Sequence, residues 1–122
     1  NVIKEFSLSE RKIVLCGFSQ GTMMSIHTAL MRKQSCAGVL GYSGMVLDFD
    51  LLKQTPHKDI PIHLIHGSAD PVIPVDEWEQ ATSALKTEGF PLSGYKSKGL
   101  AHGIDHNGIE SGFHFIKHCL ER

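Results

Sequence analysis

The chain has 122 residues, of which 41% are hydrophobic and 20% charged, and its formal net charge at pH 7 is −1. This length corresponds to one domain or part of one, and it suffices for a buried core. The near-neutral charge, without a basic block, argues against nucleic acid and anionic membrane surfaces as partners. No apolar run is long enough for stable membrane insertion. The chain begins Asn1-Val2-Ile3 without a methionine, which indicates either processing or a piece of a longer protein.

The cysteines, Cys16, Cys36 and Cys119, are odd in number and follow no recognisable spacing. This usage predicts reduced thiols in a cytoplasmic protein rather than a disulfide framework. His114 and His118 have a spacing that metal sites use on helices, but the sequence offers no third ligand for them. A solvated helix face is the simpler interpretation. The sequence therefore predicts neither a metal nor a cofactor.

The predicted elements begin with a segment over residues 1–8 that is compatible with the end of a helix, followed by a polar connection over 9–12. Residues 12–16 are predicted to form a strand, and its continuous apolar run from Ile13 to Cys16 is typical of a parallel strand covered on both faces. Cys16 would then be a small core residue. A helix follows over residues 20–33, where apolar side chains recur at helical spacing.

The rest of the chain alternates strands and helices. Residues 45–52 are apolar without a clear period, which predicts a loop or a short helix at the end of a strand. The other expected elements are strands over 37–42, 60–67 and 94–97 and helices over 75–88 and 107–120. This alternation predicts an α/β fold, with a mostly parallel sheet flanked by helices in a single domain over residues 1–122.

A Gly-x-Ser-x-Gly motif, Gly17-Phe18-Ser19-Gln20-Gly21, joins the first predicted strand to its helix. This context predicts a sharp turn that lifts the Ser19 hydroxyl above the sheet edge. Ser19 would adopt a strained, sparsely populated backbone conformation. Gly17 and Gly21 would be needed because the flanking backbone segments approach each other closely. An ordinary strand-to-helix turn is the alternative interpretation of the motif alone.

A serine hydroxyl needs a base to take its proton and a third group to orient that base. Asp70 and His102 each follow a predicted strand, as Ser19 does. The order Ser19, Asp70, His102 is that of the α/β-hydrolase triad. Because the carboxyl ends of parallel strands lie on one edge of a sheet, the three side chains are expected to converge there.

Other residues compete for two of these roles. His66, which ends a strand beside Gly67, is the strongest rival for the base, although it precedes the turn that carries Asp70. Asp48 and Asp50 follow the second predicted strand and are alternatives for the acid. Asp70 is preferred because its turn is tight and its strand is next to that of the histidine.

An oxyanion site for the reaction needs two N–H donors. The N–H of Gln20, which follows the nucleophile at a helix N-terminus, is one candidate. The second donor usually comes from a loop upstream of the elbow. The dozen residues before Ile13 contain no glycine-rich turn, so the sequence provides no candidate.

Three blocks resemble the signature blocks of the phospholipase/carboxylesterase family, which includes the acyl-protein thioesterases. They are Gly17-Phe18-Ser19-Gln20-Gly21, the nine residues 66–74 (HGSADPVIP), and Ala101-His102-Gly103-Ile104. The resemblance implies an α/β-hydrolase fold and cofactor-free hydrolysis of carboxylic esters or thioesters. It also implies Ser19 as nucleophile, Asp70 as orienting acid, His102 as base and Gln20 as one oxyanion donor.

Family members carry an N-terminal half, with further strands and the second oxyanion donor, that has no counterpart here. The chain thus resembles the C-terminal portion of the usual domain. Its nucleophile strand would lie near an open edge, which invites pairing with another chain. The sequence therefore predicts a homo-oligomer, or association with a missing N-terminal half, through residues 13–16.

The predicted function is hydrolysis of a small ester or thioester, such as a lysophospholipid or an acylated protein, through an acyl-enzyme. The expected acyl-binding wall comprises Met45 and Leu47, from the 45–52 loop, with Val72 and Ile73; core packing is the alternative role for these residues. One competing hypothesis is a catalytically impaired fragment or binding module of the same fold. Another is a peptidase or a dienelactone-type hydrolase, of which the latter favours cysteine at the elbow.

Overall fold

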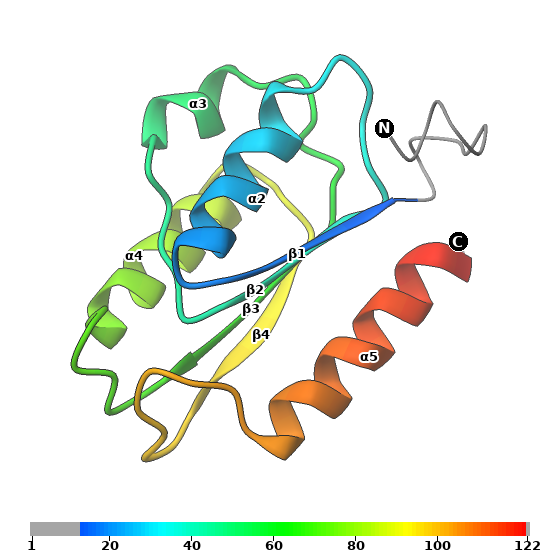
Figure 1. Ribbon diagram of the computed structural model, residues 1–122. Coiled ribbons are helices and arrows are strands. Elements are labelled where there is room, and N and C mark those ends of the chain that lie inside the picture. The colour runs from blue at the N-terminus through cyan, green and yellow to red at the C-terminus, as the bar shows by residue number, and fades with distance from the viewer. Residues whose placement is uncertain (1–12, 122) are drawn as a thin grey trace.

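The computed structural model describes residues 13–121, so the predicted segments over 1–8 and 9–12 lie outside the described residues. Strands and helices alternate along this part of the chain (Figure 1). The elements are β1 (Val14–Phe18), α2 (Gln20–Met31), β2 (Gly38–Tyr42), α3 (Phe49–Gln54), β3 (Ile62–Gly67), α4 (Val75–Thr87), β4 (Leu92–Ser97) and α5 (His106–Glu121).

The four described strands run parallel, in the order β1-β2-β3-β4. Each connection therefore crosses to the next strand in the same direction. Because such crossovers are almost always right-handed, their helices fall on one face of the sheet. Helices α2, α3 and α4 cover this face, and α5 covers the opposite one (Figure 1). The predicted α/β class with a parallel, helix-flanked sheet is confirmed.

Apolar side chains fill the space on both faces of the sheet. The larger cluster joins the central strands β2 and β3 to α2, α3 and α4, and its members include Ile26, Leu30, Val39, Leu52, Ile62, Leu64, Ala81 and Leu85. On the other face, Leu40, Tyr42 and Ile65 pack against Phe115 and Ile116 of α5. Fully burying one Leu or Ile side chain stabilises the fold by about 1.5–3 kcal/mol relative to leaving it exposed. These contacts hold the strand ends in fixed positions.

The first strand differs from its prediction in extent and in burial. β1 continues to Phe18, and Cys16 is exposed rather than a core residue. Cys16 pairs with Leu40 in the register and faces the α5 side of the sheet. Helix α5 packs mainly over the neighbouring strands, and β1 lies at the edge of the described sheet, so Cys16 is left uncovered.

The ends of other elements also shift. α2 ends at Met31, β3 begins at Ile62, and β4 begins at Leu92, before Gly94 where the strand was predicted. Gly94 has a φ of 118°, and a Cβ there would lie 1.9 Å from the carbonyl oxygen of Leu64, so glycine is required inside this strand. The predicted loop or short helix over 45–52 contains α3, which starts at Phe49.

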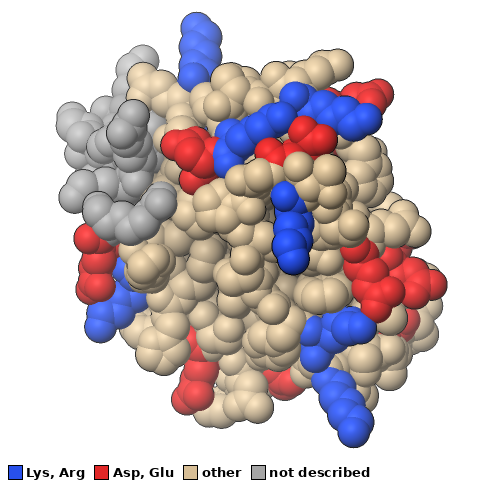
Figure 2. Space-filling view, turned by 180° about the vertical axis from the view of Figure 1, so that it is seen from behind, with Lys and Arg blue, Asp and Glu red and all other residues tan. Residues whose placement is uncertain are grey.

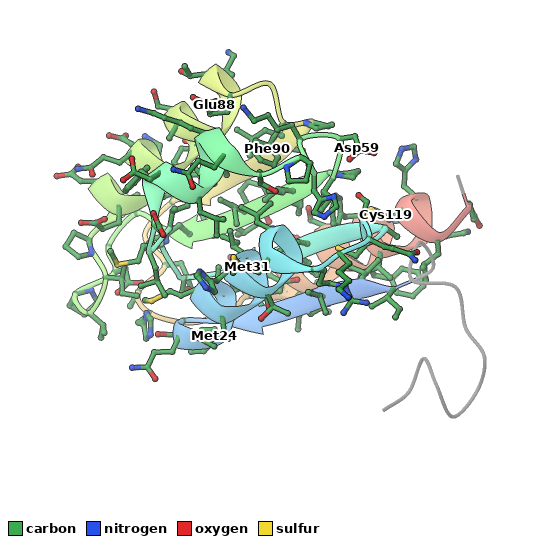
Figure 3. All side chains as sticks on the ribbon, turned by 90° about the horizontal axis from the view of Figure 1, so that it is seen from above. Met24, Met31, Asp59, Glu88, Phe90 and Cys119 are labelled. Carbon is green, nitrogen blue, oxygen red and sulfur yellow. The ribbon has the colours of Figure 1, made fainter. Side chains whose placement is uncertain are left out.

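The surface carries mixed charge. On the face shown in Figure 2, basic and acidic side chains lie next to each other in mixed groups. Wide uncharged areas separate these groups. Met24 and Met31 of α2 are exposed (Figure 3). Phe18 at the end of β1 is exposed as well. Within residues 13–121, no helix has both the length and the apolar character to cross a bilayer.

Candidate active site

Ser19 occupies the sharp turn between β1 and α2 with φ 56° and ψ −116°, a left-handed conformation that is uncommon for a residue with a side chain. Its N–H donates to the carbonyl oxygen of Tyr42 at 2.8 Å, which ties the turn to β2. A Cβ on Gly17 would lie 2.2 Å from the backbone of Gly21, so the predicted close approach at Gly17 is present. At Gly21 itself the prediction is wrong: a Cβ there would meet no described atom within 4 Å.

The hydroxyl of Thr22 braces the same turn from within the core. Its Oγ1 lies 2.8 Å from the Tyr42 carbonyl oxygen and 2.9 Å from that of Gly17, and it accepts the N–H of Tyr42 at 3.0 Å. Thr22 is 1% exposed, so water cannot replace these bonds. Several hydrogen bonds to β2 therefore keep Ser19 in its strained backbone conformation.

The sheet brings Ser19, Asp70 and His102 together at the carboxyl ends of β1, β3 and β4. Nε2 of His102 lies 3.0 Å from Oγ of Ser19, and its Nδ1 lies 2.8 Å from Oδ2 of Asp70. The Phe18 ring packs beside the imidazole, with the ring centroids 4.9 Å apart. A carboxylate accepts, so the proton sits on Nδ1, and Nε2 is left to accept the Ser19 hydroxyl.

Asp70 is held in one orientation by donors on both oxygens. Its Oδ1 accepts the N–H groups of Val72 at 2.8 Å and Ile73 at 2.9 Å. Burial opposes the charged form of this carboxyl, but the hydrogen bonds from His102, Ile73 and Val72 outweigh burial and hold its pKa below the usual range. Asp70 is therefore a buried, ionised carboxylate aimed at the imidazole.

The segment that carries His102 is fixed by contacts with the ends of β2 and β3. A Cβ on Gly67 would lie 2.1 Å from the carbonyl oxygen of Leu100, so the two backbones touch there. Ser43, which is 1% exposed and has φ 54°, donates its hydroxyl to the carbonyl oxygen of Gly103 at 3.2 Å. These contacts flank His102 on both sides.

The competing residues make other contacts than those of a base or an orienting acid. Nε2 of His66 is near Asp70, at 3.3 Å from Oδ2, and donates to the Ile73 carbonyl oxygen. Asp48 caps α3 by accepting the N–H of Leu51, and Asp50 is exposed on that helix. His102, rather than His66, is the histidine that contacts Ser19.

The other predicted site residues differ in exposure. Gln20 is the first residue of α2, where backbone N–H groups have no intrahelical acceptor. Leu47 is 55% and Val72 is 64% exposed, whereas Met45 is half-buried and Ile73 is 7% exposed. His114 and His118 are exposed on α5, and residues 13–121 contain no group of three or more potential metal ligands.

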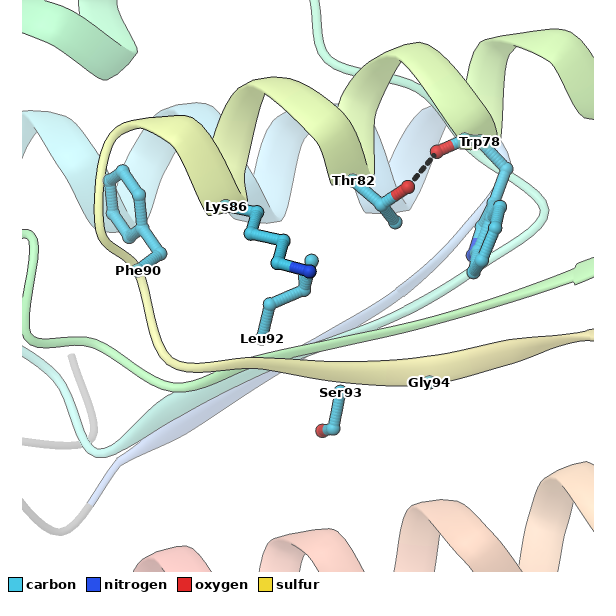
Figure 4. Close-up of a pocket in the computed structure, with 7 residues that line it drawn as sticks. All are labelled: Trp78, Thr82, Lys86, Phe90, Leu92, Ser93 and Gly94. Carbon is cyan, nitrogen blue, oxygen red and sulfur yellow. Dashed lines mark hydrogen bonds between the residues drawn. The ribbon is translucent and has the colours of Figure 1, made fainter.

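The cavity drawn in Figure 4 is lined by other residues. It has a volume of about 360 Å³ and lies between α4 and β4, lined by Trp78, Thr82, Lys86, Phe90, Leu92, Ser93 and Gly94. Its lining includes none of the predicted site residues. The chemistry of the strand ends, rather than cavity size, therefore identifies the candidate site.

The site roles of three residues were not predicted from the sequence: Thr22, Ser43 and Gly67. The signal for Ser43 was its place directly after a buried strand, before a glycine, which is where left-handed turns form. Thr22 gave no distinguishing signal, because a threonine in the first turn of a helix is usually unremarkable. Gly67 belongs to the HGSADPVIP block, but its partner segment is remote in sequence.

A parallel sheet with helices on both faces and a serine at the strand-to-helix elbow defines the α/β-hydrolase class. The match to one family is specific: the model of the phospholipase/carboxylesterase family matches residues 2–120. The chain therefore belongs to that family.

Individual relatives agree with this assignment. Acyl-protein thioesterase 1 of Aspergillus fumigatus is 32% identical over 115 residues, which cover 89% of this chain and 48% of the relative. Acyl-protein thioesterase 1 of Candida albicans is 29% identical, and the match covers 99% of this chain and 59% of the relative. The crystal structure of esterase PE8 superposes with a TM-score of 0.90 at 28% identity, covering 98% of this chain and 55% of that one. The chain spans about half the length of the curated relatives it matches.

Proposed function

We propose that this chain carries the nucleophile, base and orienting acid of a serine hydrolase that cleaves carboxylic esters or thioesters. The observation that carries the proposal is the hydrogen-bonded series from Ser19 through His102 to Asp70, with heavy-atom distances of 3.0 Å and 2.8 Å. Its support from relatives is that several are named acyl-protein thioesterase or esterase.

In the acylation step, Oγ of Ser19 attacks the acyl carbonyl carbon while Nε2 of His102 takes the hydroxyl proton. Asp70 keeps the imidazole in the Nδ1–H form and stabilises the imidazolium that results. The tetrahedral intermediate collapses when His102 gives the proton to the departing alcohol or thiol. This leaves the acyl group esterified to Ser19.

In the second step, water replaces the leaving group. His102 removes a proton from water, the resulting hydroxide attacks the acyl-enzyme, and the proton returns to Oγ of Ser19 as the acid departs. The N–H of Gln20 would donate to the oxyanion in both steps, because the start of α2 directs it toward the developing charge. A missing second donor typically lowers turnover about 100- to 1000-fold.

The acyl group would lie against Met45, Leu47 and Val72, with Ile73 supporting that wall from the interior. Leu47 and Val72 are large apolar side chains on the surface, where burial by a ligand would be favourable. A lysophospholipid or an acylated protein has the apolar acyl chain and carboxyl carbon that this arrangement fits. The expected location is the cytoplasm, because the cysteine pattern is typical of reduced thiols.

The β1 edge is the proposed contact with a partner, either a second copy of this chain or the part of the relatives that it does not match. Cys16 and Phe18 of β1 are exposed, as are Met24 and Met31 of the adjacent helix. An edge strand beside apolar side chains favours pairing. Light scattering of the stable chain at high concentration should give a mass above that of the monomer. A monomer would contradict self-association and leave the part of the relatives that this chain does not match as the proposed partner.

Hydrolysis of p-nitrophenyl acetate tests the catalytic proposal. The chain and its Ser19→Ala variant are compared at equal concentration. Ser25→Ala is the control for loss of a helix serine; Ser25 is half-buried and its hydroxyl donates to the carbonyl oxygen of Cys16. The proposal predicts that S19A is inactive and that S25A retains the activity of the unmodified chain. Equal rates for S19A and the unmodified chain would overturn the enzyme function and leave the binding-module hypothesis.

A further inference from the structure

His66 lies in β3 with its side chain 1% exposed, beside the carboxylate that His102 contacts. Its Nε2 is 2.7 Å from the carbonyl oxygen of Ile73. A carbonyl oxygen can only accept, so Nε2 carries a proton. This N–H points at the Ile73 carbonyl oxygen, and the same nitrogen lies 3.3 Å from Oδ2 of Asp70.

Two imidazoles thus converge on one carboxylate oxygen. Oδ2 of Asp70 lies 2.8 Å from Nδ1 of His102 and 3.3 Å from Nε2 of His66, and Oδ1 accepts two backbone N–H groups from the following loop. The Asp70 side chain is 0% exposed, so no water shares these oxygens. The rotation of the carboxylate is set by these three donors, and His66 holds the carbonyl oxygen of Ile73, which supplies one of them.

His66 is poorly explained as a packing residue. Its Nδ1 is buried and has no hydrogen-bond partner among the described residues. A buried polar atom without a partner opposes folding, so an apolar side chain of similar size would suit a purely structural role better. His63, on the same strand, shows the contrast: its two ring nitrogens lie within hydrogen-bond distance of Ser93 and Ser111.

From this geometry we infer that His66 is a positioning residue, which fixes the Asp70 carboxylate so that Oδ2 faces Nδ1 of His102. Its N–H donates to the carbonyl oxygen of Ile73, the residue whose own N–H holds Oδ1 of Asp70, and its imidazole packs 3.3 Å from Oδ2. The inference rests on the proposed function, because the oriented group matters through His102 and Ser19. Its consequence, a well-ordered proton between His102 and Asp70, can be observed without turnover.

Proton NMR of the full chain provides this test. A proton held between an imidazole nitrogen and a carboxylate resonates far downfield of the amide region. His66→Met removes the N–H, whereas the amide of His66→Gln can restore a donor near the position of Nε2. His63→Met is the matched control, since it removes a buried histidine from the same strand on the other face.

The expected result is a downfield resonance in the unmodified chain, H66Q and H63M, and its loss in H66M, with all four folded by circular dichroism. In the hydrolysis assay, H66M should lose up to about 100-fold in kcat with little change in KM, and H66Q should recover most of it. If H66M does not fold, His66→Asn replaces it, because its shorter amide cannot reach the Ile73 carbonyl oxygen from the position of Nε2.

Two outcomes would overturn the inference. One is an unchanged downfield resonance and kcat in folded H66M or H66N. The other is loss of the resonance in folded H66Q to the same extent as in H66M. Failure of the proposed function is distinguishable, since the chain would then show a His66-dependent resonance without Ser19-dependent hydrolysis.

Discussion

Oγ of Ser19 and Nε2 of His102 lie 3.0 Å apart, although 83 positions separate the two residues in the chain. The sheet brings the two residues together. β1 ends just before Ser19, and the segment after β4 that carries His102 lies against the ends of β2 and β3. This segment contacts Ser43 and Gly67. The approach of Ser19 to His102 therefore depends on backbone packing outside the side chains of Ser19, Asp70 and His102.

Asp70→Asn should lower kcat by about 100- to 10,000-fold while the chain stays folded, because an amide can donate to the imidazole and favour the wrong tautomer. Asp48→Asn is the control, since Asp48 only caps the short helix α3. Hydrolysis kinetics and circular dichroism check both variants. Comparable losses in the two variants would show that Asp70 has no special role.

Gly67→Ala should destabilise the chain by about 1–3 kcal/mol and reduce activity, because its Cβ would lie 2.1 Å from a backbone oxygen of the segment that leads to His102. Gly103→Ala is next to the same histidine, yet its Cβ would meet no described atom within 4 Å. Its effect should stay within about 0.5 kcal/mol. Urea unfolding measures both changes, and a tolerated G67A would refute the close approach.

The stability of the chain should fall as the pH is lowered from about 7.5 to about 5.5. Burial lowers the pKa of His63 from its ordinary value of 6.5, so in this range the unfolded chain binds a proton that the folded chain excludes. His63→Gln should reduce the slope of the unfolding free energy against pH. One such group contributes at most about 1.4 kcal/mol per pH unit to this slope. The lowered pKa values of Asp70 and Asp105 act at more acidic pH. Urea unfolding measures this free energy at each pH. An equal slope in H63Q and the unmodified chain would show that His63 is not the group responsible.

Leu47→Asp and Val72→Asp should raise KM for long-chain p-nitrophenyl esters more than for the acetate. Both side chains are exposed and would lose apolar contact with the acyl chain, worth about 0.8 kcal/mol per buried methylene. Ile109→Asp, on exposed α5 surface, is the matched control. If KM rises equally for the acetate and the long-chain esters, the acyl wall lies elsewhere.

Local patterns were sufficient to predict the order of strands and helices, the elbow at Ser19 and the meeting of Asp70 with His102. Each depends on a short-range signal: an apolar run, a Gly-x-Ser-x-Gly turn, or a polar residue just after a strand. Strand limits and the exposure of Cys16 were less predictable, because they depend on which neighbours cover each face. The contacts of His66 with Asp70 and of Ser43 with Gly103 follow from tertiary packing, which leaves no periodic trace in the sequence.

Covalent labelling with a fluorophosphonate tests the central claim most directly, because an activated serine oxygen attacks its phosphorus and displaces fluoride, which leaves a phosphonylated serine. Peptide mass spectrometry of the labelled chain should place the adduct on Ser19, and His102→Ala should abolish or greatly slow labelling. An adduct on another serine, or equal labelling rates with and without the His102 imidazole, would contradict the account.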